Sequence, residues 1–131
     1  MSDVDYRDDP TISDDADLWR RIPPWHIVSD ENIGGMRPSS AAFGDDPDGN
    51  PMSAYLADEC RDPHIALAGH EGFGLVAITA GLARECKQAI VRQPVQGPPG
   101  HVVVVGKKTD SVRKKFARAA AGRWIVRPPV V

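Results

Sequence analysis

The chain has 131 residues, of which 26% are charged and 41% hydrophobic, a composition that suits one compact domain. No apolar run reaches the roughly 18 residues of a membrane span, and the acidic N-terminus lacks the basic start of a secretory signal. The 12 Pro and 12 Gly stay below the level of collagen-like or low-complexity chains. Two cysteines, Cys60 and Cys86, exclude a disulfide scaffold and predict reduced thiols and a cytoplasmic location.

The net charge of −2 averages two unequal halves of the chain. Residues 1–60 hold 14 acidic and 4 basic side chains, whereas residues 61–131 hold 4 acidic and 12 basic ones. This division indicates either an acidic tail with a basic contact face, or two halves that neutralise each other in the fold.

The N-terminal residues 1–17 contain seven of the Asp residues and few large apolar side chains. Such a segment buries too little surface to offset its ordering entropy, which predicts a disordered acidic tail. A single domain is then expected over residues 18–131. The tail is a candidate to fold back over the basic face and compete with a partner.

The first half of the domain is rich in turn signals. Leu18–Ile22 leads into a Pro-Pro pair that stops regular hydrogen bonding, and Trp25–Val28 has the aromatic and β-branched content of a short strand. Residues 44–51 have the composition of a loop. Ser53 is expected to cap a helix that runs through Tyr55 and Leu56 to Glu59.

The second half is more regular. We expect strands at 74–79, 89–92, 101–105 and 124–126, and helices at 80–87 and 111–121. Asp110 or Thr109 is expected to cap the last helix, and Gly122 to end it. The pattern predicts a small α+β domain with about four or five short strands and two or three helices.

Several polar segments are candidates to bind an anion. The turn between the strand expected at 101–105 and the helix expected at 111–121 offers backbone N–H groups and positive charge to a phosphate. Its candidate residues are Lys107, Lys108 and Thr109, and the helix adds Arg113 and Lys114. The spacing of a P-loop is absent. The alternative interpretation is a solvated, capped turn and a solvated helix face.

A second polar group lies in the first half, at Arg37, Ser39, Ser40 and Ser53. A planar guanidinium beside hydroxyl donors suits a phosphate or another oxyanion. Capping and turn roles are the alternative for these serines.

Metal ligands are weakly represented. Cys60, His64 and His70 are close in sequence, but Asp62-Pro63 breaks the helical geometry that would bring the first two together. We predict no metal and no cofactor, although the sequence leaves binding by these three residues open. It does not predict an oligomeric state.

The chain resembles a group of short bacterial proteins through four segments, Leu18–Pro23, Arg37–Phe43, Pro51–Leu56 and His101–Lys108. This resemblance covers about residues 18–129 and implies one domain but no mechanism. Three shorter segments, Trp19-Arg20, Gly34-Gly35-Met36-Arg37 and Ala54-Tyr55-Leu56, are similar in order and spacing to RES-type toxins. That family is ADP-ribosyltransferase-like and consumes NAD. The similarity implies Arg20, Arg37, Tyr55 and Glu85 as catalytic candidates, with NAD as the cofactor.

These observations leave three functional hypotheses. The first is a small cytosolic binding module that holds a nucleic acid, a nucleotide phosphate or an acidic protein through the basic helix and the Arg/Ser loop. The second is a NAD- or nucleotide-consuming enzyme. The third is an antitoxin or accessory subunit that binds a protein partner.

Overall fold

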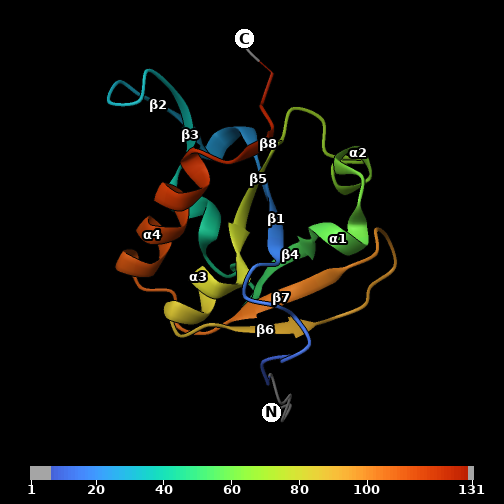
Figure 1. The fold of residues 1–131 in the computed structure, drawn as a ribbon. Helices are drawn as coiled ribbons and strands as arrows, with labels where there is room; N and C mark the ends of the chain where they lie inside the picture. The colour runs from blue at the N-terminus through green and yellow to red at the C-terminus, as the bar shows by residue number, and fades with distance from the viewer. Residues whose placement is uncertain (1–6, 130–131) are drawn as a thin grey trace.

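The computed structural model describes residues 7–129, which form eight strands and four α-helices (Figure 1). The strands are β1 (Asp17–Ile22), β2 (Ile27–Asp30), β3 (Gly35–Pro38), β4 (Met52–Leu56), β5 (Gly74–Thr79), β6 (Ala89–Arg92), β7 (His101–Val105) and β8 (Trp124–Val126). The helices are α1 (Ala57–Cys60), α2 (Pro63–Ala66), α3 (Ala80–Glu85) and α4 (Asp110–Ala121), with 3-10 turns η1 (Pro24–His26) and η2 (Ser40–Phe43). The predicted α+β class is confirmed, with more strands than expected.

One antiparallel sheet of six strands organises the domain, in the order β6-β7-β4-β1-β5-β8, and β2 and β3 form a separate hairpin. Helices α3 and α4 lie on one side of the sheet and α1 and α2 on the other (Figure 1). Consecutive side chains of β1 alternate between the two sides, as strand geometry requires. Leu18 belongs to the core under α3 and α4, whereas Trp19 packs with Cys60 and Ala66 of the opposite helices.

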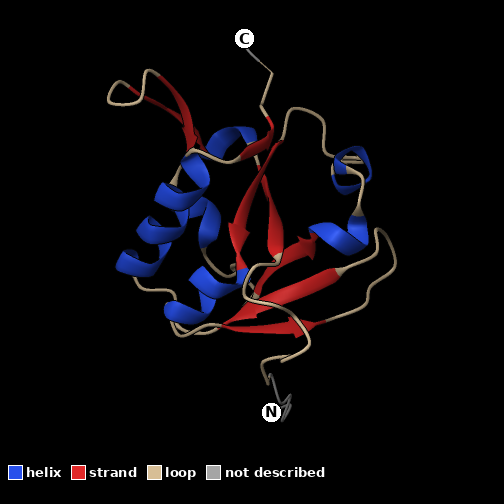
Figure 2. Ribbon diagram, viewed as in Figure 1, coloured by secondary structure: helices blue, strands red, loops and turns tan. Residues whose placement is uncertain are grey.

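Strand β1 is paired unequally with its two neighbours. It pairs with β5 over six residues, but with β4 only at Leu18–Leu56 and Trp19–Tyr55. Figure 2 shows the consequence: the antiparallel strands β1 and β5 stand upright in this view, while β4, β7 and β6 lie across the lower part of the molecule. The sheet therefore opens between β1 and β4 beyond this two-pair contact.

Two elements of the first half differ from their predictions. Residues 52–56 form strand β4 instead of the predicted helix, because Met52, Ala54 and Leu56 alternate into the core and the strand pairs with both β1 and β7. The helix begins only at Ala57. The strand predicted at 25–28 starts at Ile27, after a 3-10 turn initiated by the proline pair.

The predicted elements of the second half are confirmed as β5, α3, β6, β7, α4 and β8. Thr109 is the cap of α4, since its hydroxyl accepts a hydrogen bond from the Val112 N–H at 3.2 Å, and Gly122 follows the helix. None of the helices within residues 7–129 is long and apolar enough to cross a membrane.

The described part of the acidic N-terminal segment, residues 7–17, lies against α3 and β6. Ile12 is buried in the core, and Arg84 donates to the carboxylates of Asp8 and Asp14. A further ion pair joins Arg92 to Asp9. These contacts contrast with the disorder expected there, because pairing and one buried isoleucine offset the ordering cost that composition alone suggested. Residues 1–6 of the predicted tail lie outside the described residues.

Candidate functional site

A basic groove runs between α4 and the β2–β3 hairpin. It has a volume of about 480 Å³, and two distant parts of the chain supply the polar side chains of its walls: Asp30, Asn32, Arg37, Ser40, Lys114 and Arg118. Ala117 and Ala121 form a floor of small side chains. We call this site the basic groove.

The amphipathic pattern of α4 places these cations. Phe116, Ala117 and Ala120 are buried against the sheet and η2, where the Phe116 ring meets Phe43 edge-on at 6.2 Å. Lys114 and Arg118 are one helical turn apart and therefore share a face outside that buried stripe. Both are exposed, and neither has an ion-pair partner within residues 7–129.

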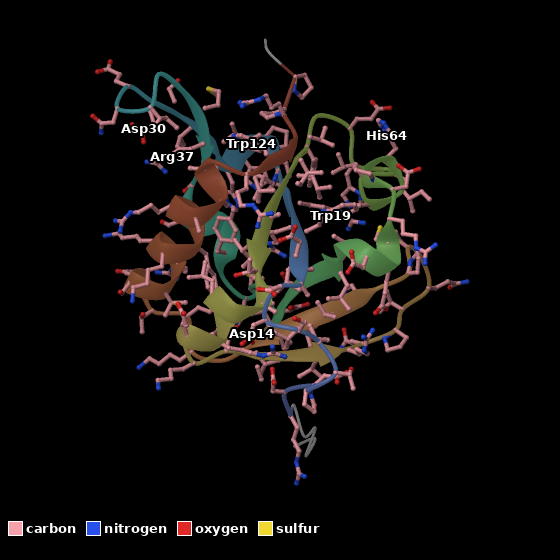
Figure 3. All side chains as sticks on the ribbon, in the orientation of Figure 1. Asp14, Trp19, Asp30, Arg37, His64 and Trp124 are labelled. Atoms are coloured by element: carbon pink, nitrogen blue, oxygen red, sulfur yellow. The ribbon has the colours of Figure 1, made fainter. Side chains whose placement is uncertain are left out.

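Arg37 enters the groove from the hairpin with a carboxylate beside it. Its Nε lies 2.8 Å from Asp30 Oδ2, and its Nη1 donates to the Pro38 carbonyl at 3.2 Å. Figure 3 shows Arg37 and Asp30 together on the hairpin, next to α4. The pair fixes the guanidinium in place and reduces its free charge, so Lys114 and Arg118 supply most of the groove's positive field.

A second site, which we call the arginine cavity, lies where β1 and β4 separate. It measures about 200 Å³, and both strands and the segment before β5 contribute to it, through Arg20, Arg21, Ser53, Tyr55, His70 and Phe73. Trp19, which Figure 3 labels, also lines the cavity. No Asp or Glu among the described residues lines this cavity.

The Arg20 side chain connects β1 to β4 at the point where the two strands no longer pair. Its Nη1 donates to the Ser53 carbonyl at 2.8 Å, and its Nε donates to the Ala42 carbonyl at 3.0 Å. Burial is the largest influence on this guanidinium and lowers its pKa to about 10. Arg20 remains charged at neutral pH, and no carboxylate within residues 7–129 forms an ion pair with it.

Arg21 is held by neutral groups as well. Its Nε donates to the Ala66 carbonyl at 2.5 Å and its Nη2 to the Tyr55 hydroxyl at 3.2 Å. The guanidinium carbon lies 4.9 Å from the centre of the Tyr55 ring, a cation–π arrangement. The His101 ring packs edge-on against the Tyr55 ring at a centroid distance of 5.3 Å.

The turn predicted to bind phosphate has a structural role at its second lysine. The Lys108 side chain is 3% exposed, its Nζ donates to the Val104 carbonyl at 2.7 Å, and it pairs with Asp45 at 2.6 Å. Lys107 is exposed, and Thr109 caps α4. Arg113 pairs with Asp110 on its own helix. These four residues lie outside both sites. Capping, internal hydrogen bonds or an ion pair hold three of them, and Lys107 is exposed to solvent.

The serines are divided among three roles. Ser39 caps η2, since its Oγ accepts from the Ala41 N–H at 3.2 Å, as the capping alternative proposed. Ser40 lines the basic groove and Ser53 the arginine cavity, where its Oγ lies 3.4 Å from Arg20 Nη1.

The four catalytic candidates do not converge on one place. Arg20 and Tyr55 share the arginine cavity, whereas Arg37 lies in the basic groove and Glu85 is exposed on α3. The structure thus brings together two of these residues without the acid.

The residues considered for a metal are likewise dispersed. Cys60 is buried, and burial raises the pKa of its thiol; His64 is exposed. The His70 Nδ1 lies 2.9 Å from the Ala68 carbonyl oxygen. Within residues 7–129, no three His, Cys, Asp or Glu side chains are grouped so that they could hold a metal ion.

Two arginines of these sites were not among the predicted ligands. Arg118 follows Lys114 by one helical turn, so the helical spacing itself was a usable signal. Arg21 gave no such signal, because its position depends on the separation of β1 from β4, which local sequence does not encode.

Comparison of the chain with protein-family models, with curated proteins and with solved structures finds no match. The two resemblances noted in the sequence therefore stay predictions. The function has to be argued from the sites themselves.

Proposed function

We propose that this chain is a small cytosolic binding module that holds the phosphate backbone of a nucleic acid in the basic groove. The observation that carries the proposal is the meeting of Lys114 and Arg118 of α4 with Arg37 and Ser40 of the hairpin region. Two cations that have no ion-pair partner in the described part of the chain, a fixed guanidinium and a hydroxyl then face one open groove. Each of these groups donates hydrogen bonds to phosphate oxygens.

The character of the groove favours the backbone over the bases as the bound part of the nucleic acid. The groove residues include no aromatic side chain within the described part of the chain, so there is no ring on which a base could stack. Phosphate contacts need only Lys and Arg and release counterions when they form. We therefore expect binding that depends strongly on salt and weakly on sequence.

The test measures the affinity for a short DNA duplex over a series of salt concentrations. The double variant Lys114→Ala/Arg118→Ala should bind at least about tenfold more weakly, because each charged hydrogen bond contributes roughly 1.5–3 kcal/mol. The slope of log affinity against log salt should fall in magnitude by about 2. Lys115→Ala is the matched control, since Lys115 is an exposed lysine of the same helix that does not line the groove.

Three results would contradict the proposal. The first is an equal loss of duplex affinity in the double variant and in the control, which would indicate a general charge effect. The second is equal binding of polyglutamate, which would indicate an acidic protein as partner. The third is tighter binding of a free nucleotide than of the duplex, which would favour a nucleotide site.

A further inference from the structure

The arginine cavity contains two consecutive arginines that have no ion pair with a carboxylate within residues 7–129. Five other arginines do pair with an Asp or Glu, namely Arg37, Arg84, Arg92, Arg113 and Arg123. Arg20 and Arg21 instead donate to backbone carbonyls and to hydroxyl groups. The cavity thus brings two positive charges together, and that of Arg20 is buried.

Neutral acceptors only partly replace the hydration that a guanidinium loses on burial. The nearest acidic influences on Arg20 come from Asp46 and Asp45, and Asp45 is itself paired with Lys108. The hydrogen bonds of Arg20 use its Nε and Nη1, while no contact within residues 7–129 uses its Nη2. A donor therefore remains available in the cavity for a negatively charged group.

The rest of the wall is aromatic. Trp19 and Tyr55 line the cavity from β1 and β4, and Phe73 lines it from the segment before β5. The His70 ring packs edge-on against Phe73 at 5.0 Å, which holds that wall in place. Rings arranged in this way suit contact with another planar ring.

We infer that the arginine cavity is a binding site for a small aromatic phosphate or carboxylate. The oxyanion contacts Arg21, which lies on the same side of β1 as Trp19, and the ring of the ligand lies against Trp19 and Phe73; Arg20 lines the same cavity and adds positive charge. A volume of about 200 Å³ fits one ring with one anionic group and falls below the roughly 300–1,000 Å³ of sites for larger ligands. This site shares no lining residue with the basic groove, so the inference does not depend on the proposed function.

The test is titration calorimetry of the full chain with four probes: phenyl phosphate, benzoate, inorganic phosphate and benzamide. Phenyl phosphate and benzoate should bind, inorganic phosphate should bind at least about tenfold more weakly than phenyl phosphate, and benzamide, which has the ring but no charge, should not bind. The Arg21→Lys variant keeps the charge but loses the planar fork of donors, and it should weaken phenyl phosphate binding about tenfold. Arg20 is left intact because it also connects β1 to β4.

Matched controls separate the cavity from the groove. Arg37→Lys makes the same chemical change in the basic groove and should leave phenyl phosphate binding unchanged. Phe73→Leu should weaken phenyl phosphate but not inorganic phosphate, and circular dichroism checks that each variant is folded.

Equal binding of benzamide and benzoate would overturn the anionic part of the inference, and equal binding of phenyl and inorganic phosphate would overturn the aromatic part. Absence of binding by all four probes would overturn the site altogether. A loss in Arg37→Lys with none in Arg21→Lys would do the same, because it would place the ligand in the groove. Duplex binding is measured separately, so each proposal can fail alone.

Discussion

The basic groove and the arginine cavity use the same kinds of side chain in opposite surroundings. In the groove, Lys114 and Arg118 are exposed and have no ion-pair partner within residues 7–129, and Arg37 is paired with Asp30. In the cavity, the guanidinium of Arg20 is buried and Arg21 is half-buried, and the partners of both within the same residues are neutral. An unpaired cation in water costs little free energy, whereas an enclosed one needs compensation. The cavity arginines therefore stabilise the fold and are also candidates to bind a ligand. The exposed cations of the groove are candidates to bind a ligand but contribute little to the stability of the fold.

The largest difference should appear in the free energy of unfolding when one arginine is removed from each region. Arg20→Ala leaves the carbonyls of Ser53 and Ala42 without their charged donor, and we expect a loss of about 2–4 kcal/mol. Arg37→Ala breaks a partly exposed ion pair and should cost about 1 kcal/mol or less. Urea unfolding of the two variants measures the contrast, and equal losses would show that Arg20 has no special structural role.

Lys107 and Lys108 show the same difference between an exposed and a buried cation within a single turn. Lys108→Ala removes a buried ammonium that donates to two carbonyls, those of Val104 and Gly106, and pairs with Asp45; we expect a loss of about 1–3 kcal/mol. Lys107→Ala alters an exposed side chain and should change stability by less than about 0.5 kcal/mol. Thermal unfolding of both variants is the measurement. A reversed order would contradict the structural role of Lys108.

The smallest expected effect is on the pH dependence of stability, through His26 and the nearby charge of Arg20. Burial, and then the charge of Arg20, lower the pKa of His26 below its ordinary value of 6.5. As the pH falls, His26 therefore takes up a proton in the unfolded chain before it does so in the folded chain. The neutral His26 does not lower the free energy of unfolding above about pH 7, and that free energy decreases as the pH falls below 6.5. His26→Gln should flatten this part of the stability profile. An unchanged slope would contradict the assignment to His26.

The same histidine reports on the cavity. An anion beside Arg20 removes one of the two causes of the lowered pKa, so phenyl phosphate should raise the pKa of His26 in an NMR titration. Benzamide, the uncharged control, should leave that pKa unchanged.

Local sequence predicted the second half of the fold well and the first half poorly. Residues 101–105 and 111–121 have a clear strand pattern and a clear capped helix, and both are present. Residues 52–56 contain a possible cap and helix-compatible side chains, but pairing with β1 and β7 makes them a strand. Tertiary pairing outweighs local preference there, and a single sequence does not reveal it.

The candidate sites were predictable to a similar degree. Arg37, Ser40 and Lys114 were expected to bind an anion, and the fold brings all three into one groove. Lys108 was expected to face a ligand, but three oxygen atoms inside the domain bind its ammonium group. The arginine cavity depends on where two strands part. That is a property of the whole sheet, and no local pattern predicts it.

The most direct test of the account maps the amide NMR shifts of the chain during titration with a short DNA duplex. We predict shifts at residues 37–40 and 114–121 that disappear at high salt, with little change around α1 and α2. Shifts confined to the α1–α2 side of the sheet, or shifts that persist unchanged at high salt, would contradict it.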